Sequence, residues 1–346
     1  MTKIILKKGR EDSLLRFHPW VFSGAIAQVV GNPAEGDIVG VFSQGGDFLA
    51  YGHYQIGSIA VRVLSFASED VLSPDFWRNM IARALKVRIA VGLSGAVPEH
   101  ESPAPEPVEG PALTNCYRLV HGEGDGLPGL IIDYYDGVCV IQAHSVGMFR
   151  AKGAICEALK SVFGLSLKAV YDKSSGTAPF KAGLDLVDGY LYRSPDFSDD
   201  EQVVLENGHK FFVNWTEGQK TGFFLDQREN RALVGKYSRG RNVLNLFCYT
   251  GGFSVYALGN GAVHVDSVDS SRKAVDMVER NISLNGFDAS RHTGYCTDAI
   301  EFLRNVPEDK YDLMIVDPPA FAKHRGALNN ALRAYQRLNA AAISKV

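Results

Sequence analysis

From Arg241 onward, short apolar runs alternate with longer segments whose apolar residues recur at helical spacing. The order strand, helix, strand, helix is typical of a parallel sheet with helices on both faces. We therefore predict an α/β fold with a doubly wound, Rossmann-like sheet. The predicted strands are 243–249, 262–269, 291–296 and 311–319, and the predicted helices are 253–260, 271–285, a segment after Asp298, and 329–346.

The sheet is preceded by two regions of different character. Residues 1–73 consist of short alternating runs broken by glycine, which predicts a small β-barrel or sandwich. Residues 74–195 mix helical and strand-like runs, which predicts a central α+β domain. The third predicted domain spans 196–346 and contains the parallel sheet.

Local signals support this division. Residues 76–91 have helical spacing and are followed by Gly92 as a stop signal. Asn207-Gly208 separates two β-type runs, which is the pattern of a tight hairpin. The segment 94–112 is rich in proline and acidic residues, so we predict a disordered loop there.

Composition excludes several classes of protein. A formal net charge of -3 gives no overall attraction to nucleic acid, so any such contact needs local patches. The five cysteines include no C-x-x-C pair, which argues against a disulfide framework and a zinc site and favours a reducing cytoplasm. No apolar run is long enough for a membrane span. We expect no metal and no membrane partner.

The first predicted strand of the sheet ends in a glycine pair, Gly251-Gly252, with Ser254 near the start of the next helix. Glycines at such a turn let the backbone approach a ligand closely. Asp269 ends the second strand, where a carboxylate accepts hydrogen bonds from ribose hydroxyls. Asp298 follows the third strand, where a side chain meets an adenine edge. These features predict a nucleoside-containing cofactor.

S-adenosylmethionine fits this turn better than a nicotinamide dinucleotide, because the turn lacks the G-x-G-x-x-G that cradles a pyrophosphate. The fourth strand ends in Asp317-Pro318-Pro319-Ala320-Phe321. We interpret this motif as a stiff corner where the substrate meets the methyl donor, with Phe321 stacking on a flat base. Taken alone, the motif also suits an ordinary turn that ends a strand.

With these motifs, the chain resembles the class I S-adenosylmethionine-dependent methyltransferases of a bacterial family that makes 5-methylcytosine in large-subunit ribosomal RNA and carries an N-terminal PUA domain. The resemblance extends over nearly the whole chain. It rests on H-P-W-V-F-S-G-A-I at 18–26, G-E-G-D-G-L-P-G-L-I-I-D at 122–133, G-Q-K-T-G-F-F-L-D-Q-R at 218–228, and D-P-P-A-F at 317–321.

The resemblance implies a set of site residues. Those expected to bind or cover the cofactor are Gln219, Lys220, Thr221, Phe223, Arg228, Asn245, Phe247, Thr250, Gly251, Gly252, Asp269, Asp298 and Asp317. The residues expected to serve catalysis are Asp317, Pro318 and Phe321. An alternative for the segment before the sheet is a helix start in which Asp226 caps the helix that carries Arg228.

The PUA-like barrel is expected to contact RNA through basic and aromatic side chains, although for each lysine taken singly a solvated charge is the favoured explanation. The candidates are Lys7, Lys8, Arg10, Arg16 and Trp20. Glu123 and Asp125 lie in a glycine-rich stretch, where a turn that joins domains is favoured over a cation site.

Methylation of cytosine C5 requires a cysteine thiolate that attacks C6. In the family this cysteine follows a fifth strand, whereas the printed sequence ends at Val346 after the fourth strand and its helix. Cys248 and Cys296 are better explained as small residues that line the cavity. We therefore expect a chain truncated at its C-terminus, with a cofactor pocket largely present, catalysis absent or severely impaired, and an exposed apolar edge at 314–316.

The expected partner is RNA, in particular large-subunit ribosomal RNA, and a homodimer is considered as the oligomeric state. Two alternatives stay open. One is a methyltransferase that acts on an exocyclic amine of a nucleobase, because D-P-P-[YF] serves that chemistry. The other is a non-catalytic RNA-binding protein that retains a vestigial cofactor fold.

Overall fold

The computed structural model describes residues 2–68, 71, 73–93, 114–179, 183–198, 201–322 and 325–346. The predicted disordered loop at 94–112 lies outside the described residues. The chain divides into two compact units. Unit 1 comprises Met1–Gln202 and Asn214–Phe223, and unit 2 comprises Val203–Val213 and Phe224–Val346. The barrel and the central sheet thus belong to one unit, and the parallel sheet belongs to the other.

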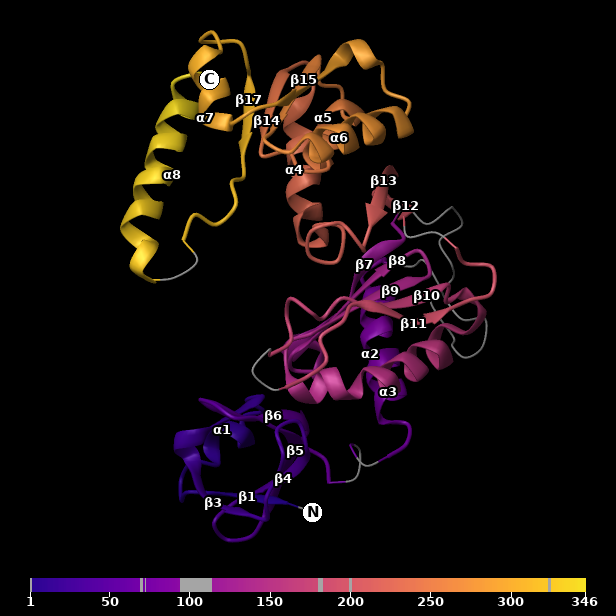
Figure 1. The fold of residues 1–346 in the computed structure, drawn as a ribbon, viewed down its shortest axis with the longest axis vertical. Helices are drawn as coiled ribbons and strands as arrows, with labels where there is room; N and C mark the ends of the chain where they lie inside the picture. Colours follow the sequence, from indigo (N-terminus) through magenta and orange to yellow (C-terminus); the bar gives the residue numbers. More distant parts are fainter. Residues whose placement is uncertain are drawn as a thin grey trace. The chain divides into compact units, whose positions relative to one another are not determined.

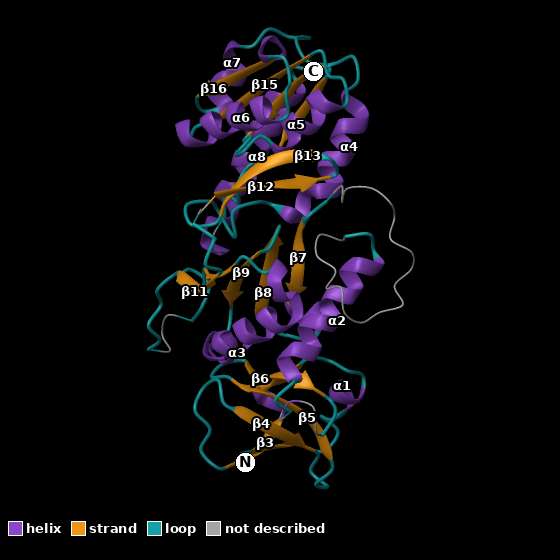
Figure 2. Cartoon of the chain, turned by 90° about the vertical axis from the view of Figure 1, so that its right-hand side faces the viewer, coloured by secondary structure: helices purple, strands orange, loops and turns teal. Residues whose placement is uncertain are grey.

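The N-terminal part of unit 1 is a six-stranded, mostly antiparallel sheet in the order β2-β6-β5-β4-β1-β3 (Figure 2). Alternating apolar side chains such as Ile4, Val39 and Val61 fill its core. The predicted β-rich first region is confirmed. Its strands are β1 (Lys3–Leu6), β2 (Trp20–Phe22), β3 (Ile26–Val30), β4 (Ile38–Phe42), β5 (Phe48–Tyr54) and β6 (Ile59–Ser65), with the helical turns α1 (Asp12–Leu15) and η1 (Ser23–Ala25).

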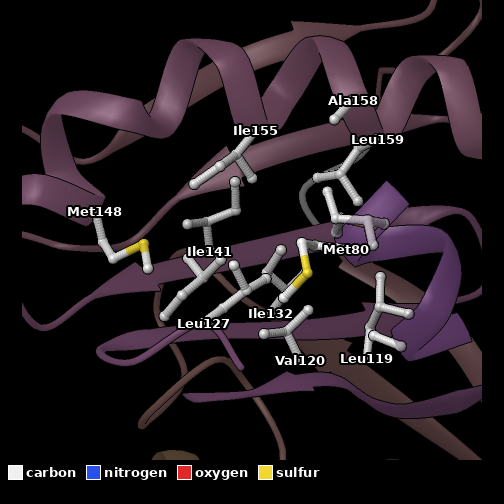
Figure 3. Packing of buried hydrophobic residues seen from close by; sticks show 14 of the residues in the cluster. Met80, Leu119, Val120, Leu127, Ile132, Ile141, Met148, Ile155, Ala158 and Leu159 are labelled. Carbon is white, nitrogen blue, oxygen red and sulfur yellow. The ribbon is translucent and has the colours of Figure 1, made fainter. Parts of the chain in front are cut away.

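The rest of unit 1 is built on a five-stranded sheet in the order β11-β10-β9-β8-β7. Two helices pack on it, and Figure 3 shows Ile155 and Leu159 of α3 directed toward Ile132 and Ile141 of the sheet. The elements are α2 (Phe76–Ala90), β7 (Cys116–His121), η3 (Gly122–Asp125), β8 (Leu130–Tyr135), β9 (Val138–Ala143), α3 (Val146–Phe163), η4 (Gly164–Ser166), β10 (Ala169–Asp172) and β11 (Gly189–Arg193).

The hairpin predicted at Asn207-Gly208 is present, formed by β12 (Glu201–Glu206) and β13 (His209–Asn214). Both loop residues have positive φ, 48° at Asn207 and 83° at Gly208, as a two-residue type I′ turn requires. Helix α4 (Arg228–Ser238) follows the short turn η6 (Leu225–Gln227). The residue before α4 is Gln227, which makes no side-chain cap, so the predicted cap by Asp226 is wrong.

Unit 2 contains the predicted parallel sheet, four strands in the order β16-β15-β14-β17. Helices α7 and α8 lie on one face, and α4, α5 and α6 lie on the other (Figure 1). The doubly wound α/β fold is confirmed. The elements are β14 (Asn242–Leu246), α5 (Gly252–Gly259), β15 (His264–Asp269), α6 (Arg272–Leu284), η7 (Ala289–Arg291), β16 (His292–Cys296), α7 (Ala299–Asn305), β17 (Leu313–Val316), η8 (Arg325–Ala327) and α8 (Leu328–Ile343).

Strand β17 lies at one edge of this sheet and pairs with β14 within the described residues. Its side chains differ from the expectation of an exposed apolar edge. Ile315 is buried, and Met314 and Val316 pack against a core that includes Leu338 of α8. The face of β17 that carries Met314 and Val316 is therefore covered by α8. In the part of the chain that the structure describes, no helix has the length and apolar character needed to span a bilayer.

Candidate active site

The carboxyl ends of the four parallel strands bring the predicted site residues of unit 2 to one edge of the sheet. Leu246 pairs in register with Val268 and with Val316, so the next residue of each strand lies in one row. Phe247, Asp269 and Asp317 occupy that row, and Cys296 pairs with Asp269. Since neighbouring strands are about 4.8 Å apart, the Cα atoms of Asp269 and Asp317 are about 10 Å apart across β14.

The turn after β14 has an uncommon backbone. Phe247, Tyr249 and Gly251 have φ of 58°, 46° and 77°, so alternate residues are left-handed. Such conformations cost free energy in non-glycine residues and tend to occur at functional sites. The Cys248 amide donates to the carbonyl of Val268 at 3.1 Å, which holds the turn against β15. The strand ends at Leu246 rather than at 249 as predicted, because the chain turns left-handed at Phe247.

Asp269 fixes this turn with both carboxylate oxygens. The Tyr249 amide donates to Oδ2 at 3.1 Å, and the Ser271 amide donates to Oδ1 at 2.9 Å. Each carboxylate oxygen has a second lone pair, so Asp269 can still accept hydrogen bonds from ligand hydroxyls. The residue expected to hold a ribose thus also orients the turn expected to face the cofactor.

The glycine pair of the turn has a packing role that the sequence did not predict. A Cβ at Gly251 would lie 2.7 Å from Val278 Cγ1, and a Cβ at Gly252 would lie 2.9 Å from Arg231 Cδ. The side chain of Arg231 is buried and paired with Glu206, with Nε and a terminal nitrogen each 2.7 Å from a carboxylate oxygen. The pair therefore seats the start of α5 against α4 and α6.

Asn245 of β14 is buried beside the turn. Its Nδ2 donates to Ser254 Oγ at 2.8 Å, and Ser254 Oγ lies 2.7 Å from Ser267 Oγ. In the described part of the chain, its buried Oδ1 has no hydrogen-bond partner. A buried acceptor of this kind is usually satisfied by a ligand or by water. Thr250, the other polar residue predicted here, is also buried.

Two hydrogen bonds to backbone amides account for the position of Asp298. Its Oδ1 accepts from the amides of Ile300 and Glu301 at 2.9 and 3.0 Å, so it is the N-cap of α7. The side chain is exposed at the end of β16. Its predicted role toward an adenine stays a prediction.

The D-P-P-A-F motif follows β17 directly. Asp317 is exposed and Pro318 is partly buried. The ring of Phe321 lies 4.6 Å from that of Tyr335 in α8, and the Phe321 amide donates to Tyr335 Oη at 3.4 Å. Tyr335 is a supporting residue that the motif did not reveal, because the contact depends on how α8 packs.

The predicted cofactor segment before α4 is divided between the units. Gln219, Lys220, Thr221 and Phe223 belong to unit 1, whereas Arg228 belongs to unit 2. Thr221 is buried and donates to Asp133 Oδ2 at 2.5 Å, and its hydroxyl lies 2.9 Å from Tyr135 Oη. Arg228 Nε lies 3.1 Å from Glu229 Oε1. The cofactor roles of these five residues stay predictions.

Two aromatic residues were missed by sequence reasoning. The ring of Phe224 lies edge-on to that of Tyr249, with centroids 5.3 Å apart. Tyr249 lies within the strained turn and directly precedes T-G-G in the sequence. Its position next to the glycine pair was the signal that could have identified it as a site residue.

The cysteines of the sheet domain differ in environment. Cys248 is buried, and this burial, followed by the negative charge of Asp269, raises the pKa of its thiol. It is therefore a poor nucleophile. Cys296 is partly exposed, and its Sγ lies 3.5 Å from the carbonyl of Ser270. Among the described residues, no cluster of histidine, cysteine and carboxylate side chains is arranged to hold a metal ion.

The barrel side chains predicted to meet RNA are mostly exposed, namely Lys7, Lys8, Arg10 and Arg16. Trp20 differs, because its indole Nε1 donates to Glu123 Oε1 at 2.9 Å. Arg62 also contacts Glu123 Oε1, at 3.1 Å. Glu123 therefore joins the barrel to the central sheet, in agreement with the turn favoured for it.

Comparisons with known proteins agree with this architecture. The PUA-like domain family matches residues 4–66, and the S-adenosylmethionine-dependent methyltransferase family matches residues 189–343. "Ribosomal RNA large subunit methyltransferase I" of Aeromonas hydrophila is 39% identical over 98% of this chain and 81% of its own length. The protein of that name from Pseudoalteromonas translucida is 37% identical, with the same shares covered.

Solved structures share the fold. A methyltransferase complexed with SAH superposes with a TM-score of 0.74 at 23% identity, covering 94% of this chain and 78% of that one. A SAM-dependent methyltransferase from Streptococcus mutans gives a TM-score of 0.72 at 22% identity, covering 96% and 82%.

The doubly wound sheet, its carboxyl-edge row and the PUA-like barrel define a class I S-adenosylmethionine-dependent methyltransferase. The chain belongs to the ribosomal RNA large subunit methyltransferase I family. Its cofactor is S-adenosylmethionine. The site of unit 2 fits that group, because Asp269 keeps free lone pairs and Asn245 keeps an unsatisfied buried acceptor at the edge where such sheets bind ligands.

Proposed function

We propose that this chain serves the formation of 5-methylcytosine in large-subunit ribosomal RNA by binding the cofactor and positioning the target base. The names of the relatives support the RNA substrate, and the motifs at 122–133, 218–228 and 317–321 support the product. The observation that supports the proposal is the row formed by Phe247, Asp269 and Asp317, because a carboxylate and the D-P-P corner then lie at one edge of one sheet.

Within this proposal, each side chain has a defined task. When bound, S-adenosylmethionine supplies a methyl group on a sulfonium centre. Asp269 accepts hydrogen bonds from the ribose hydroxyls, and Asp298 faces the adenine edge. Asp317 and Pro318 form the corner that receives the target base, and Phe321, backed by Tyr335, presents its ring to that base.

We assign the thiolate that would attack C6 to none of the five cysteines of the sequence. Cys116, Cys139 and Cys156 are buried in unit 1, and burial raises the pKa of the Cys139 and Cys156 thiols. Cys248 is disfavoured on the same physical ground. The tasks proposed for this chain are therefore to bind the cofactor and to position the base.

The product is tested by nucleoside mass spectrometry on large-subunit ribosomal RNA from cells with and without the gene. We expect one 5-methylcytidine to disappear with the gene and to return when the gene is restored. Loss of a base methylated on an exocyclic amine would replace the C5 assignment with the amine alternative. Unchanged nucleosides together with retained RNA binding would favour a non-catalytic RNA-binding protein.

A further inference from the structure

Unit 1 contains a hollow of about 770 Å³ that is lined by one residue of the candidate active site, Lys220, and otherwise by residues outside that site. Its walls come from β6 of the barrel, from β7, β8 and β9, from the residues that follow β10, and from the turn that carries Lys220. All of these residues belong to unit 1. A volume of this size is typical of a ligand site rather than of a packing defect.

The charge on these walls is mainly positive. Four lining residues are cationic, namely Arg62, Arg118, Lys173 and Lys220, whereas two are acidic, Glu123 and Asp188. Arg118 is held rigidly, because Nε and a terminal nitrogen lie 2.9 and 3.1 Å from the two oxygens of buried Asp133. A guanidinium oriented in this way is preorganised for a further anion.

His144 and Lys173 both respond to this environment. Desolvation, followed by the charges of Arg118 and Arg62, lowers the pKa of His144, so its ring is neutral at neutral pH. Desolvation also lowers the pKa of Lys173, with the negative charge of Asp188 acting in the opposite direction. The Lys173 ammonium donates to the carbonyl of Gly218 at 2.5 Å and has no ion pair within the described residues. An anion in the hollow would offset the desolvation of this ammonium.

The remaining lining chemistry distinguishes a phosphate from a base. Apart from the imidazole of His144, the hollow has no aromatic side chain on which a base can stack. It is lined instead by glycines and by the hydroxyl-bearing Ser175 and Thr177. Cations, hydroxyls and exposed backbone amides are the groups that contact nucleic-acid phosphates. A free nucleotide would leave its base without the apolar, aromatic wall that small-molecule sites usually supply.

We propose that this hollow binds a phosphodiester segment of the RNA substrate and so contacts the RNA through residues other than those at the carboxyl edge of the parallel sheet. The inference rests on the proposed function, because it takes RNA as the substrate. The contacts are to the sugar-phosphate backbone, so they position the RNA without reading its sequence.

The test is fluorescence anisotropy of the full chain with a labelled single-stranded oligoribonucleotide at several salt concentrations. Lys173→Gln keeps a donor for the Gly218 carbonyl but removes the charge. It should weaken binding severalfold and reduce the slope of log K against log salt by about 0.7. Asp188→Asn keeps an acceptor for the Ser175 amide, now 2.8 Å from the carboxylate, and removes a negative charge. It should tighten RNA binding severalfold and leave S-adenosylmethionine affinity unchanged.

Lys86→Gln is the matched control, because Lys86 is an exposed lysine of unit 1 on α2 and does not line the hollow. It should bind RNA like the unchanged protein. Opposite effects of Lys173→Gln and Asp188→Asn identify a field effect, since a loss of structure would weaken binding in both variants. Far-UV circular dichroism checks that each variant folds.

Two results would overturn the proposal while leaving the proposed function intact. One is RNA binding by Lys173→Gln and Asp188→Asn that equals that of the unchanged protein. The other is weaker RNA binding in both variants, because a field effect cannot have the same sign for the loss of a positive and of a negative charge. If the unchanged protein binds no RNA, both the RNA substrate and this hollow's role fail.

Discussion

Gly251 is the N-cap residue of helix α5 and has φ of 77°, and its Cα faces the side chain of Val278. Two separate penalties therefore oppose any side chain at this position. A left-handed backbone costs an L-residue about 1 kcal/mol, and an added carbon 2.7 Å from Val278 Cγ1 must displace packed atoms. Local packing and backbone conformation alone therefore account for this glycine.

We expect Gly251→Ala to lower the free energy of unfolding of unit 2 by about 2 to 4 kcal/mol, measured by urea denaturation. Gly286→Ala is the control. Gly286 has φ of 70°, but nothing lies within 4 Å of a Cβ built there, so only the backbone penalty of about 1 kcal/mol applies. Equal losses in the two variants would mean that the contact with Val278 relaxes without cost.

Asp269 is the residue on which the cofactor proposal most depends. Asp269→Asn removes the charge and one of the two acceptors that hold the Tyr249 and Ser271 amides. Because hydrogen bonds to a charged group contribute about 1.5 to 3 kcal/mol, we expect S-adenosylmethionine affinity to fall roughly 10- to 100-fold in calorimetric titration. Asp276→Asn, on the exposed side of α6, should bind as the unchanged protein does. Unaltered affinity in Asp269→Asn would remove this residue from the proposed site.

Sequence alone places Asp269 and Asp317 correctly at strand ends, because the alternation of strands and helices fixes which residues follow a strand. It does not give the bond of Thr221 to Asp133, because that tertiary contact joins residues 88 positions apart. The bonds that make Asp298 the N-cap of α7 are local by contrast, and the preference of aspartate for this position was the available signal.

Strand β16 carries a titratable group at its start. His292 is partly buried, its Nε2 lies 2.9 Å from Ser267 Oγ, and burial, followed by the charge of His264, lowers its pKa to about 4. Asp266 acts in the opposite direction and is itself bound by Lys310 at 2.7 Å. The folded strand therefore favours the neutral imidazole.

The lowered pKa of His292 predicts that the protein loses stability as the pH falls. The unfolded chain takes up a proton near pH 6.5 and the folded chain only near pH 4, so acidification through that window favours unfolding. We expect His292→Asn to lose about 1 to 2 kcal/mol less stability than the unchanged protein between pH 7 and pH 5, measured by urea denaturation. The control His121→Asn changes an exposed residue of unit 1. It should leave the difference in free energy of unfolding between pH 7 and pH 5 unchanged. A pH dependence that His292→Asn does not alter would contradict the prediction.

The elements themselves were largely predictable, because each had a local cause. The Asn207-Gly208 turn has the positive φ values that its sequence demands, and Ser271 caps α6 where a helix start was expected. The end of β14 was placed three residues too late, since an apolar run does not reveal that Phe247 turns left-handed. The buried pair of Arg231 and Glu206 had no local signal at all.

At the scale of the whole molecule, three predicted domains correspond to two compact units, and the segment 214–223 belongs to the first of them. All three tryptophans, Trp20, Trp77 and Trp215, lie in unit 1. Tryptophan fluorescence therefore reports the unfolding of unit 1, whereas far-UV circular dichroism reports both units. Because the tryptophans report on unit 1 alone, the effect of the cofactor on the stability of unit 1 can be measured. This measurement tests the cofactor roles predicted for Gln219, Lys220, Thr221 and Phe223.

If those residues bind the cofactor, S-adenosylmethionine stabilises unit 1 as well as unit 2. At a concentration 100 times the dissociation constant, a ligand adds about 2.7 kcal/mol to the state that binds it. We expect the tryptophan-monitored urea midpoint to rise with the cofactor, together with the midpoint seen by circular dichroism. Lys220→Gln should reduce the rise seen by tryptophan, whereas Lys86→Gln should not. If the cofactor raises the urea midpoint seen by circular dichroism but not the midpoint seen by tryptophan fluorescence, the site is confined to unit 2. Gln219, Lys220, Thr221 and Phe223 would then not belong to it.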